Sequence, residues 1–275
     1  GDHVYKMNYA EMLQEHIEKD AACTIAVLQV SMEDATRFGI MNVGEDGYIN
    51  EFEEKPQHPK SDLASMGIYI FNWKKLKHYL IEDEKNAESD KDFGKNIIPS
   101  MLAAGEKLWP YRFEGYWRDV GTIISLWDAN MDMLSPTLID LYNEDWPIRG
   151  RSAIRPPQWI GGQAEVSHSI VTEGCEVEGS VSNSVLSNSV VVGEGAVVNY
   201  SILMPGAEIE PGAVIEYAII GERTRIGANA HVGTQPDGSE SWGVATVGPG
   251  ICVGENAVIP AGAMIYEDTE VERHD

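Results

Sequence analysis

Residues 185–215 read VLSNSVVVGEGAVVNYSILMPGAEIEPGAVI, and an aliphatic residue stands at every sixth position of this stretch. A period of six is too short for an α-helical repeat unit and does not match the 3.5-residue period of a coiled coil. It indicates one short strand per six residues, with the recurring aliphatic side chain pointing into a shared core. Three such strands form one turn of a parallel β-helix, and each turn buries its neighbour. The aliphatic positions are Val185, Val191, Val197, Leu203, Ile209 and Ile215, then Ile220, Ile226 and Val232, then Val247, Val253, Ile259, Ile265 and Val271.

Small residues stand two positions before many of these aliphatic residues, where they allow a tight corner between strands; they include Gly195, Ala207, Ala213 and Ala263. The series is interrupted at residues 233–243 (GTQPDGSESWG), which we expect to form a loop that leaves the coil. No lysine follows Lys107, so the composition also changes along the chain.

The part of the chain before the repeats mixes strand and helix patterns. Residues 23–30 (CTIAVLQV) are typical of a strand buried on both faces, and residues 39–52 predict a hairpin with Asp46 and Gly47 in its turn. Strands that alternate with helices predict a layered α/β domain with a mainly parallel sheet. The other expected elements are a strand at 63–71, a helix at 73–81 capped by Asn72, a helix at 93–104 closed by Gly105, an extended segment at 111–120 and a helix at 122–134.

A further helix is expected to start at Asn8, in a capping-box-like sequence. Its helical spacing places four residues on one face: Met12, Leu13, His16 and Ile17.

The composition excludes several classes of protein. With 20 Lys and Arg against 44 Asp and Glu, the formal charge is −24, and so acidic a surface repels nucleic acid. No apolar stretch approaches the roughly 20 residues of a membrane span. The three cysteines, Cys23, Cys175 and Cys252, match neither a disulfide framework nor a zinc-ligand spacing. We therefore expect a reducing, cytoplasmic compartment.

Two aspartates and a lysine predict phosphate chemistry in the first part. Asp2 and Asp119 each lie beside a glycine at an expected strand end, and Mg²⁺ prefers one or two carboxylates together with substrate phosphate oxygens. Lys55 precedes Pro56, which favours an extended lysine offering its charge to a phosphate. The helix that begins near Thr122 adds a positive N-terminal dipole.

Five motifs in order, GDHVYKMNY, FEEKP, SMGIYIF, KDFGKNIIP and YWRDVGT, followed by the repeats, closely resemble bacterial glucose-1-phosphate adenylyltransferase (ADP-glucose pyrophosphorylase). The resemblance covers essentially the whole chain. It implies that residues 1–134 are the C-terminal portion of a Rossmann-like nucleotidyltransferase domain, 135–160 a connector, and 161–275 a left-handed β-helix of hexapeptide repeats. It also implies adenylyl transfer from ATP to glucose 1-phosphate, the first committed step of glycogen biosynthesis.

The resemblance further implies roles for individual residues. Asp2 and Asp119 match metal-binding aspartates, Lys55 the lysine on the sugar phosphate, and Glu54 the carboxylate on the sugar hydroxyls. The resemblance implies a catalytic set of Asp2, Asp119 and Lys55, with Mg²⁺ as the cofactor. It implies that the substrate is bound by Gly39, Glu54, Lys55, Ser65, Tyr69, Asp92, Phe93 and Trp117.

The family's Gly-rich, Arg-containing ATP loop has no counterpart in this sequence. We therefore expect the adenine contacts to lie outside it, and the polypeptide alone to have little or no transferase activity. The family is allosteric, and Arg149, Arg151 and Arg155 could contribute to an effector site, although simple pairing with nearby acids explains them as well.

Three rival interpretations stay open. One is a non-catalytic regulatory subunit of a mixed tetramer, which the presence of Asp2, Lys55 and Asp119 disfavours. Another is a related sugar-1-phosphate nucleotidyltransferase with a different base. The third is a β-helix acyltransferase, which lacks support because no histidine stands in a suitable coil. Long β-helix faces and sheet edges favour a homotetramer, or a heterotetramer with a related subunit.

Overall fold

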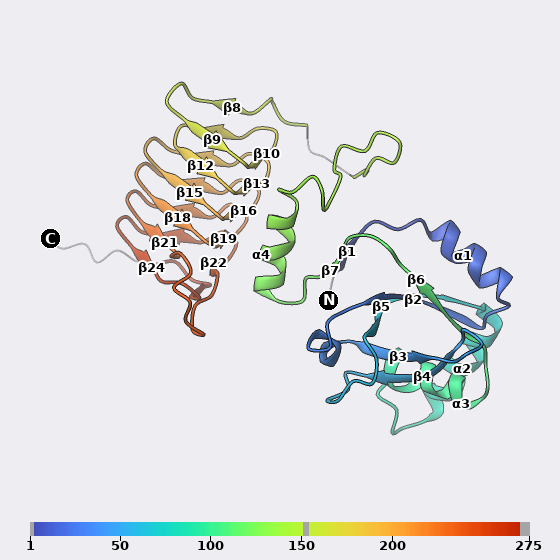
Figure 1. Ribbon diagram of the computed structural model, residues 1–275. Helices are drawn as coiled ribbons and strands as arrows, with labels where there is room; N and C mark the ends of the chain where they lie inside the picture. The colour runs from blue at the N-terminus through green and yellow to red at the C-terminus, as the bar shows by residue number, and fades with distance from the viewer. Residues whose placement is uncertain (1–2, 151–153, 270–275) are drawn as a thin grey trace. The chain divides into compact units, whose positions relative to one another are not determined.

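A computed structural model describes residues 3–150 and 154–269 (Figure 1). The chain divides into two compact units, of which one holds residues 5–115 and the other residues 116–275 together with residues 1–4. The helix expected at residues 122–134 lies in the second of these units. No helix in the described ranges is long and apolar enough to cross a membrane.

The unit of residues 5–115 contains a five-stranded sheet in the order β4-β3-β5-β2-β6. The strands are β2 (Cys23–Gln29), β3 (Gly39–Val43), β4 (Ile49–Glu54), β5 (Leu63–Phe71) and β6 (Leu108–Arg112). Only β2 and β6 pair in parallel, whereas β2–β5, β3–β4 and β3–β5 are antiparallel. The prediction of a mainly parallel sheet is thus wrong for the described strands, because the hairpin β3–β4 and the insertion of β5 between β3 and β2 reverse the chain direction.

Helices cover both faces of this sheet (Figure 1). Ile25 faces a core shared with α2 (Trp73–Lys85) and α3 (Ile98–Ala103). The neighbouring Thr24 points to the opposite face, where its hydroxyl bonds to His16 of α1 (Tyr9–Glu18) at 2.8 Å. Strand β2 is therefore buried on both sides, as its sequence predicts. Two short helical turns complete the unit: η1 (Asp34–Arg37) and the π-helical η2 (Phe93–Ile97).

The expected helix starts are confirmed, because Asn8 and Asn72 each accept a hydrogen bond from a backbone N–H two residues later. The expected apolar face of α1 is only half correct. Met12 and His16 are buried, but the side chains of Leu13 and Ile17 are 46% and 64% exposed.

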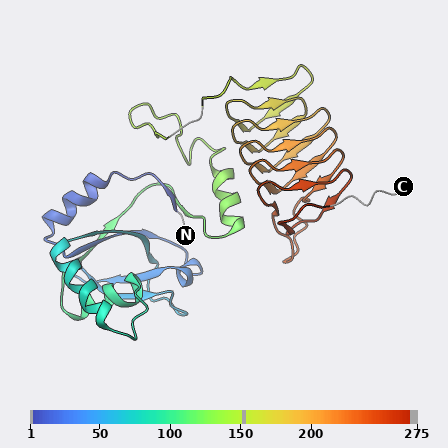
Figure 2. The ribbon, with the colours of Figure 1, turned by 180° about the vertical axis from the view of Figure 1, so that it is seen from behind.

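Residues 159–265 form a parallel β-helix, as predicted (Figures 1 and 2). Three six-stranded sheets share the core, and all of their strand pairs are parallel. The first sheet holds β8 (Trp159–Ile160), β11 (Glu176–Val177), β14 (Val191–Val192), β17 (Glu208–Ile209), β20 (Arg225–Ile226) and β23 (Cys252–Val253). The second holds β9 (Glu165–Ser167), β12 (Ser180–Ser182), β15 (Val197–Asn199), β18 (Val214–Glu216), β21 (His231–Val232) and β24 (Val258–Ile259). The third holds β10 (Ile170–Val171), β13 (Val185–Leu186), β16 (Ile202–Leu203), β19 (Ala218–Ile220), β22 (Ala245–Val247) and β25 (Met264–Ile265).

The inward register differs from the predicted one in the first coils. The core residues there are Leu186, Val192 and Val198, all fully buried, whereas their predicted neighbours Val185, Val191 and Val197 face outward. A step of one residue moves a side chain to the other face of a strand. For the same reason Ala196, and not Gly195, is the small core residue before Val198. From Leu203 to Ile265 the predicted positions face the core, and Val271 lies outside the described residues.

The coil length explains this slip. Val191 pairs with Glu208 and Glu208 with Arg225, so a regular coil takes 17 residues and not three times six. One strand step in each such coil is five residues long, and it falls at the corner where Tyr200 and Tyr217 adopt positive φ angles of 46° and 48°. Residues 233–243 contain no strand and lengthen one coil, as expected.

Helix α4 (Ile123–Asp132) packs on the outside of the third sheet, and Figures 1 and 2 show it beside the strands. Thr122 caps its start by accepting from the Ser125 N–H at 3.1 Å. Ile202 and Ile219 point outward and are covered by α4, and the Trp127 Nε1–H donates to the Tyr200 carbonyl at 2.8 Å. The third sheet therefore carries apolar residues on both of its faces.

Candidate functional site

The carboxylate of Glu54 lies at the centre of the predicted sugar site. Glu54 ends β4 and pairs with Gly39 at the start of β3. A Cβ atom added at Gly39 would lie 2.9 Å from Glu54 Oε2 and 2.5 Å from Phe52 Cζ. The bare Gly39 backbone therefore borders the carboxylate directly, and any side chain at this position would displace it.

Asp92 and Phe93 approach the same carboxylate from the start of η2. Asp92 caps this turn, because its Oδ1 accepts from the Lys95 N–H at 2.9 Å. A Cβ atom added at the buried Gly94 would lie 2.5 Å from Glu54 Oε2 and 3.3 Å from Asp92 Oδ1. Two carboxylates thus lie close together, and Lys55 and Lys95 are the cations that act on Glu54 electrostatically.

Three aromatic rings form one wall beside these groups. The ring of Tyr69 stacks on that of Phe93 with centroids 5.9 Å apart, and Phe71 contacts both at 5.8 and 5.6 Å. The hydroxyls of Tyr69 and Ser65 lie 3.4 Å apart on β5, and Ser65 Oγ accepts from the Gly67 N–H. Aromatic faces beside hydroxyls and carboxylates are suited to a sugar ring, which has apolar faces and polar edges.

Burial tunes two of the titratable groups in this cluster. Loss of solvation raises the pKa of Glu54, with Asp92 adding to the effect and Lys55 and Lys95 opposing it. Loss of solvation also raises the pKa of Tyr69, while the hydrogen bond to Ser65 opposes the shift. The tyrosine is therefore a neutral hydrogen-bonding group at physiological pH.

Lys55 does not have the extended conformation predicted from Pro56. Its φ is 51°, in the left-handed region, while its N–H still donates to the Phe38 carbonyl at 3.0 Å. The expectation was wrong because the strand turns sharply at this residue once its last hydrogen bond to the hairpin is made. The lysine side chain is exposed at the end of β4, next to Glu54.

The predicted metal site lies in the other unit and is only partly described. Asp2 lies outside the described residues, but β1 (His3–Tyr5), which follows it, pairs with β7 (Trp117–Asp119) in a two-stranded sheet. Asp119 Oδ1 accepts from the Gly121 N–H at 3.0 Å and lies 4.0 Å from His3 Nε2. The ring of His3 packs edge-on against Trp117 at 5.1 Å, which fits a packing role for this histidine.

These residues fit a magnesium ion in part. The strand pairing brings the chain next to Asp2 beside Asp119, and Asp119 Oδ2 is not engaged by the bond to Gly121. Within the described ranges, no three His, Cys, Asp or Glu side chains form a metal-binding group. One or two carboxylates are enough for an Mg²⁺ ion that also binds substrate phosphates.

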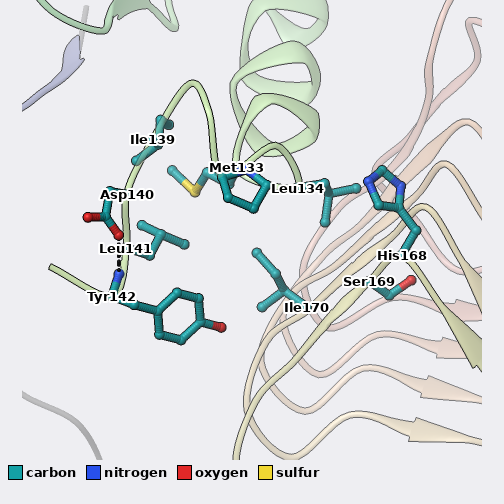
Figure 3. Close-up of a pocket in the computed structure, with 10 residues that line it drawn as sticks. Met133, Leu134, Ile139, Asp140, Leu141, Tyr142, His168, Ser169 and Ile170 are labelled. Atoms are coloured by element: carbon teal, nitrogen blue, oxygen red, sulfur yellow. Dashed lines mark hydrogen bonds between the residues drawn. The ribbon is translucent and has the colours of Figure 1, made fainter.

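The connector forms a separate hollow of about 230 Å³ against the first coils of the β-helix (Figure 3). Its walls are mostly apolar, with Met133, Ile139, Leu141 and Ile170 among them. Of its polar residues, Asp140 accepts from the Tyr142 N–H, and His168 bonds to Asn183. The hollow therefore offers little chemistry for a charged effector.

Neither of the two described arginines expected at an effector site, Arg149 and Arg155, lines this hollow. Arg155 donates to Ser189 Oγ at 3.0 Å, Arg149 is exposed, and Arg151 lies outside the described residues. The effector site stays a prediction.

Similarity to known proteins agrees with this geometry. Residues 1–136 match the nucleotidyl transferase family, and residues 158–254 match the GlmU-like, C-terminal hexapeptide family. The first part of the chain is therefore similar in sequence to nucleotidyl transferases. The chain is 48% identical to a glucose-1-phosphate adenylyltransferase of Acetivibrio thermocellus over 274 residues, which is 99% of this chain and 64% of that relative. It is also 56% identical to that of Clostridium perfringens strain 13 over 211 residues, which is 76% of this chain and 54% of the relative.

The resemblance noted from the motifs is thereby confirmed. The chain spans between about half and two thirds of the length of the curated relatives it matches.

The structure gathers one part of the predicted site within a single unit. Gly39, Glu54, Lys55, Ser65, Tyr69, Asp92 and Phe93 all belong to the unit of residues 5–115, whereas Trp117 and Asp119 belong to the other unit. Sequence reasoning missed Phe71 and Gly94. Both lie inside the quoted motifs SMGIYIF and KDFGKNIIP, so the motifs were the available signal.

Proposed function

We propose that the protein containing this sequence transfers the adenylyl group of ATP to α-D-glucose 1-phosphate, giving ADP-glucose and pyrophosphate. The proposal rests on one observation: Glu54 and Asp92 lie close together, in the same unit as Lys55, the Ser65 hydroxyl and the stacked rings of Tyr69 and Phe93. The similarity to glucose-1-phosphate adenylyltransferases supports the choice of sugar and nucleotide.

Each group has a role that its chemistry suits. The carboxylates of Glu54 and Asp92 accept hydrogen bonds from sugar hydroxyls, while the rings of Tyr69 and Phe93 pack against a face of the sugar. Lys55 places a positive charge on the sugar phosphate, and the bare Gly39 backbone leaves the space that the Glu54 carboxylate and the Phe52 ring occupy. A phosphate oxygen of the sugar then attacks the α-phosphorus of ATP in line with the leaving pyrophosphate. Such a displacement depends mainly on positioning and on neutralising charge.

Asp2 and Asp119 are the residues we assign to Mg²⁺. When bound, the ion would neutralise the negative charge that builds up between the two phosphates. An Asp119→Asn substitution should weaken binding of Mg²⁺ alone, measured by calorimetry. Asp20→Asn is the matched control, because this exposed aspartate pairs with Lys107 and should leave metal binding unchanged.

The test of the proposed function is ligand selectivity followed by turnover. Calorimetry should show that the wild-type chain binds glucose 1-phosphate more tightly than glucose 6-phosphate, and that Glu54→Gln weakens this binding. The natural protein that contains this sequence should then convert radiolabelled ATP to ADP-glucose in the presence of Mg²⁺. Equal binding of both sugar phosphates, or efficient transfer to a different sugar 1-phosphate, would overturn the assignment.

Further expectations belong to the same proposal. The regulatory-subunit alternative predicts that glucose 1-phosphate binds without any transfer by the natural protein. We also propose a cytoplasmic tetramer, homomeric or with a related subunit, and size-exclusion chromatography with light scattering would measure its mass.

A further inference from the structure

Gly94 separates the two carboxylates of the sugar site. A Cβ atom added there would lie 2.5 Å from Glu54 Oε2, 3.1 Å from Glu54 Cδ and 3.3 Å from Asp92 Oδ1. The first distance is far below ordinary van der Waals contact, and the other two are slightly shorter than it. Both carboxylates therefore occupy space that any other residue at position 94 would fill.

The backbone at position 94 does not itself require glycine. Its φ lies outside the left-handed region where glycine is favoured, so alanine could adopt the same conformation. Gly94 is nevertheless buried, in the π-helical turn η2, and such turns are frequent at functional sites. The absence of a side chain at Gly94 therefore leaves space for the Glu54 carboxylate, and the backbone conformation does not depend on it.

The surroundings restrict where the Glu54 carboxylate could move. Gly39 also borders the carboxylate, since a Cβ atom added there would lie 2.9 Å from Glu54 Oε2, and Phe52 fills the space next to Gly39. Asp92 carries a like charge and opposes an approach from its side. A methyl group at position 94 would therefore push the carboxylate out of its present place.

We propose that Gly94 is a positioning residue that seats the Glu54 carboxylate for recognition of the sugar hydroxyls. This inference rests on the proposed function, since it assumes that Glu54 contacts the sugar. Hydrogen bonds to a charged group depend steeply on distance and angle, so a carboxylate displaced by about 1 Å loses much of its contact. Gly94 thus contributes to sugar affinity without touching the sugar through a side chain.

The test is a double-mutant cycle on glucose 1-phosphate affinity, measured by calorimetry with the whole chain. Gly94→Ala should weaken binding by about tenfold or more, as expected when a hydrogen bond to a charged group is lost. Glu54→Asp, whose carboxylate is one methylene shorter, should weaken binding in the wild-type background. In the Gly94→Ala background it should cause no further loss, or restore part of the affinity, because the shorter side chain avoids the added methyl group.

Gly162→Ala is the matched control, because a Cβ atom added at Gly162 meets no atom within 4 Å. This variant should bind glucose 1-phosphate like the wild type.

If wild-type protein fails to bind the sugar phosphate, the proposed function fails. If wild type binds and Gly94→Ala binds within twofold of it, or if the two substitutions are simply additive, only the inference on Gly94 is overturned. If Gly94→Ala does not fold, the Gly94→Ala and Glu54→Asp double variant must fold; failure of both would show that Gly94 serves the backbone and would overturn the inference.

Discussion

Lys55 shows how a single residue can combine a strained backbone with an exposed charge. Its left-handed φ of 51° costs about 1 kcal/mol or more for a residue with a Cβ atom. The turn directs the chain away from β4 directly after Glu54. The charged Lys55 side chain therefore lies next to the Glu54 carboxylate of the proposed sugar site. Backbone strain of this kind is often found at functional sites.

Replacing Lys55 tests its charge without changing the backbone cost, because alanine also carries a Cβ atom. Lys55→Ala should weaken glucose 1-phosphate binding by about tenfold, since a charge-assisted contact to the phosphate is lost. Lys60→Ala is the control, because Lys60 is a nearby exposed lysine in the sequence and pairs with Glu51 at 2.5 Å. Calorimetry on both variants provides the measurement. Equal losses in both would mean that general charge, and not Lys55, attracts the ligand.

His16 gives a second residue-level prediction, for stability against pH. Its side chain is buried and bonds to Thr24 Oγ1, and burial lowers its pKa below the ordinary 6.5. Well above pH 6.5 the ring is neutral in both the folded and the unfolded state and contributes no pH dependence. As pH falls below 6.5, the unfolded chain takes up a proton that the folded chain resists, so the free energy of unfolding decreases until the folded pKa is passed.

The measurement is the urea midpoint at pH 7.5 and at pH 5.5. His16→Gln should show a smaller drop in midpoint between the two conditions than the wild type. His58→Gln, at an exposed position, should keep the wild-type drop. A full drop in the His16 variant would assign the pH dependence to other groups.

At the scale of a strand, the β-helix depends on which of two adjacent aliphatic residues faces the core. Val197 and Val198 are neighbours in β15, yet Val197 is 38% exposed and Val198 is fully buried. Both residues have the same side chain, so the pair compares two faces of one strand. The core face contributes to stability by burial, whereas the outer face contributes little.

Val198→Asp should therefore destabilise the protein by about 3 kcal/mol or more, because it buries a charge without a partner. Val197→Asp should change the free energy of unfolding by only about 0.5 kcal/mol, as is usual on a surface. Urea unfolding followed by circular dichroism separates the two. Similar losses in both variants would contradict the inward register described above.

At the scale of the whole molecule, α4 belongs to the repeats and not to the five-stranded sheet. It covers Ile202 and Ile219 on the outside of the third sheet, and Trp127 stacks toward Tyr217 with centroids 5.8 Å apart. The Trp127 indole also donates to the Tyr200 carbonyl. The residues that follow Asp119 are thereby anchored to the β-helix.

Trp127→Ala should destabilise this packing locally by about 2 kcal/mol, which is less than the loss expected for a fully buried tryptophan. A loss of about 2 kcal/mol raises the local opening equilibrium constant roughly thirtyfold. Hydrogen exchange of peptides within residues 123–132 should become faster accordingly. Trp73→Ala is the control, because Trp73 is 66% exposed and lies in the other unit. Unchanged exchange in the Trp127 variant would show that the helix holds its place without this residue.

Apart from Lys55, which was also predicted from phosphate chemistry, the residues of the candidate sugar site were predictable only through their motifs. The sequence FEEKP and the sequence KDFGKNIIP predicted Glu54, Lys55, Asp92 and Phe93, because each matched a family pattern. The spacing of residues in the sequence does not reveal that β4 and η2 contact each other. The proximity of Gly94 to Glu54 was therefore not predictable. The left-handed conformation of Lys55 was not predictable either, since Lys55 donates its backbone N–H to the carbonyl of Phe38, which is distant in the chain.

The sequence by itself determined the repeat architecture and the helix starts, because both depend on local periodicity and on side chains that bond to their own neighbouring backbone. Only the tertiary structure decided three other features: the inward face in the first coils, the mixed direction of the five-stranded sheet, and the seat of the Glu54 carboxylate between Gly39 and Gly94. Each of these depends on segments that are distant in the chain. Adjacent aliphatic residues such as Val197 and Val198 are equally able to be buried, and the corner that favours one of them is fixed by packing of whole coils.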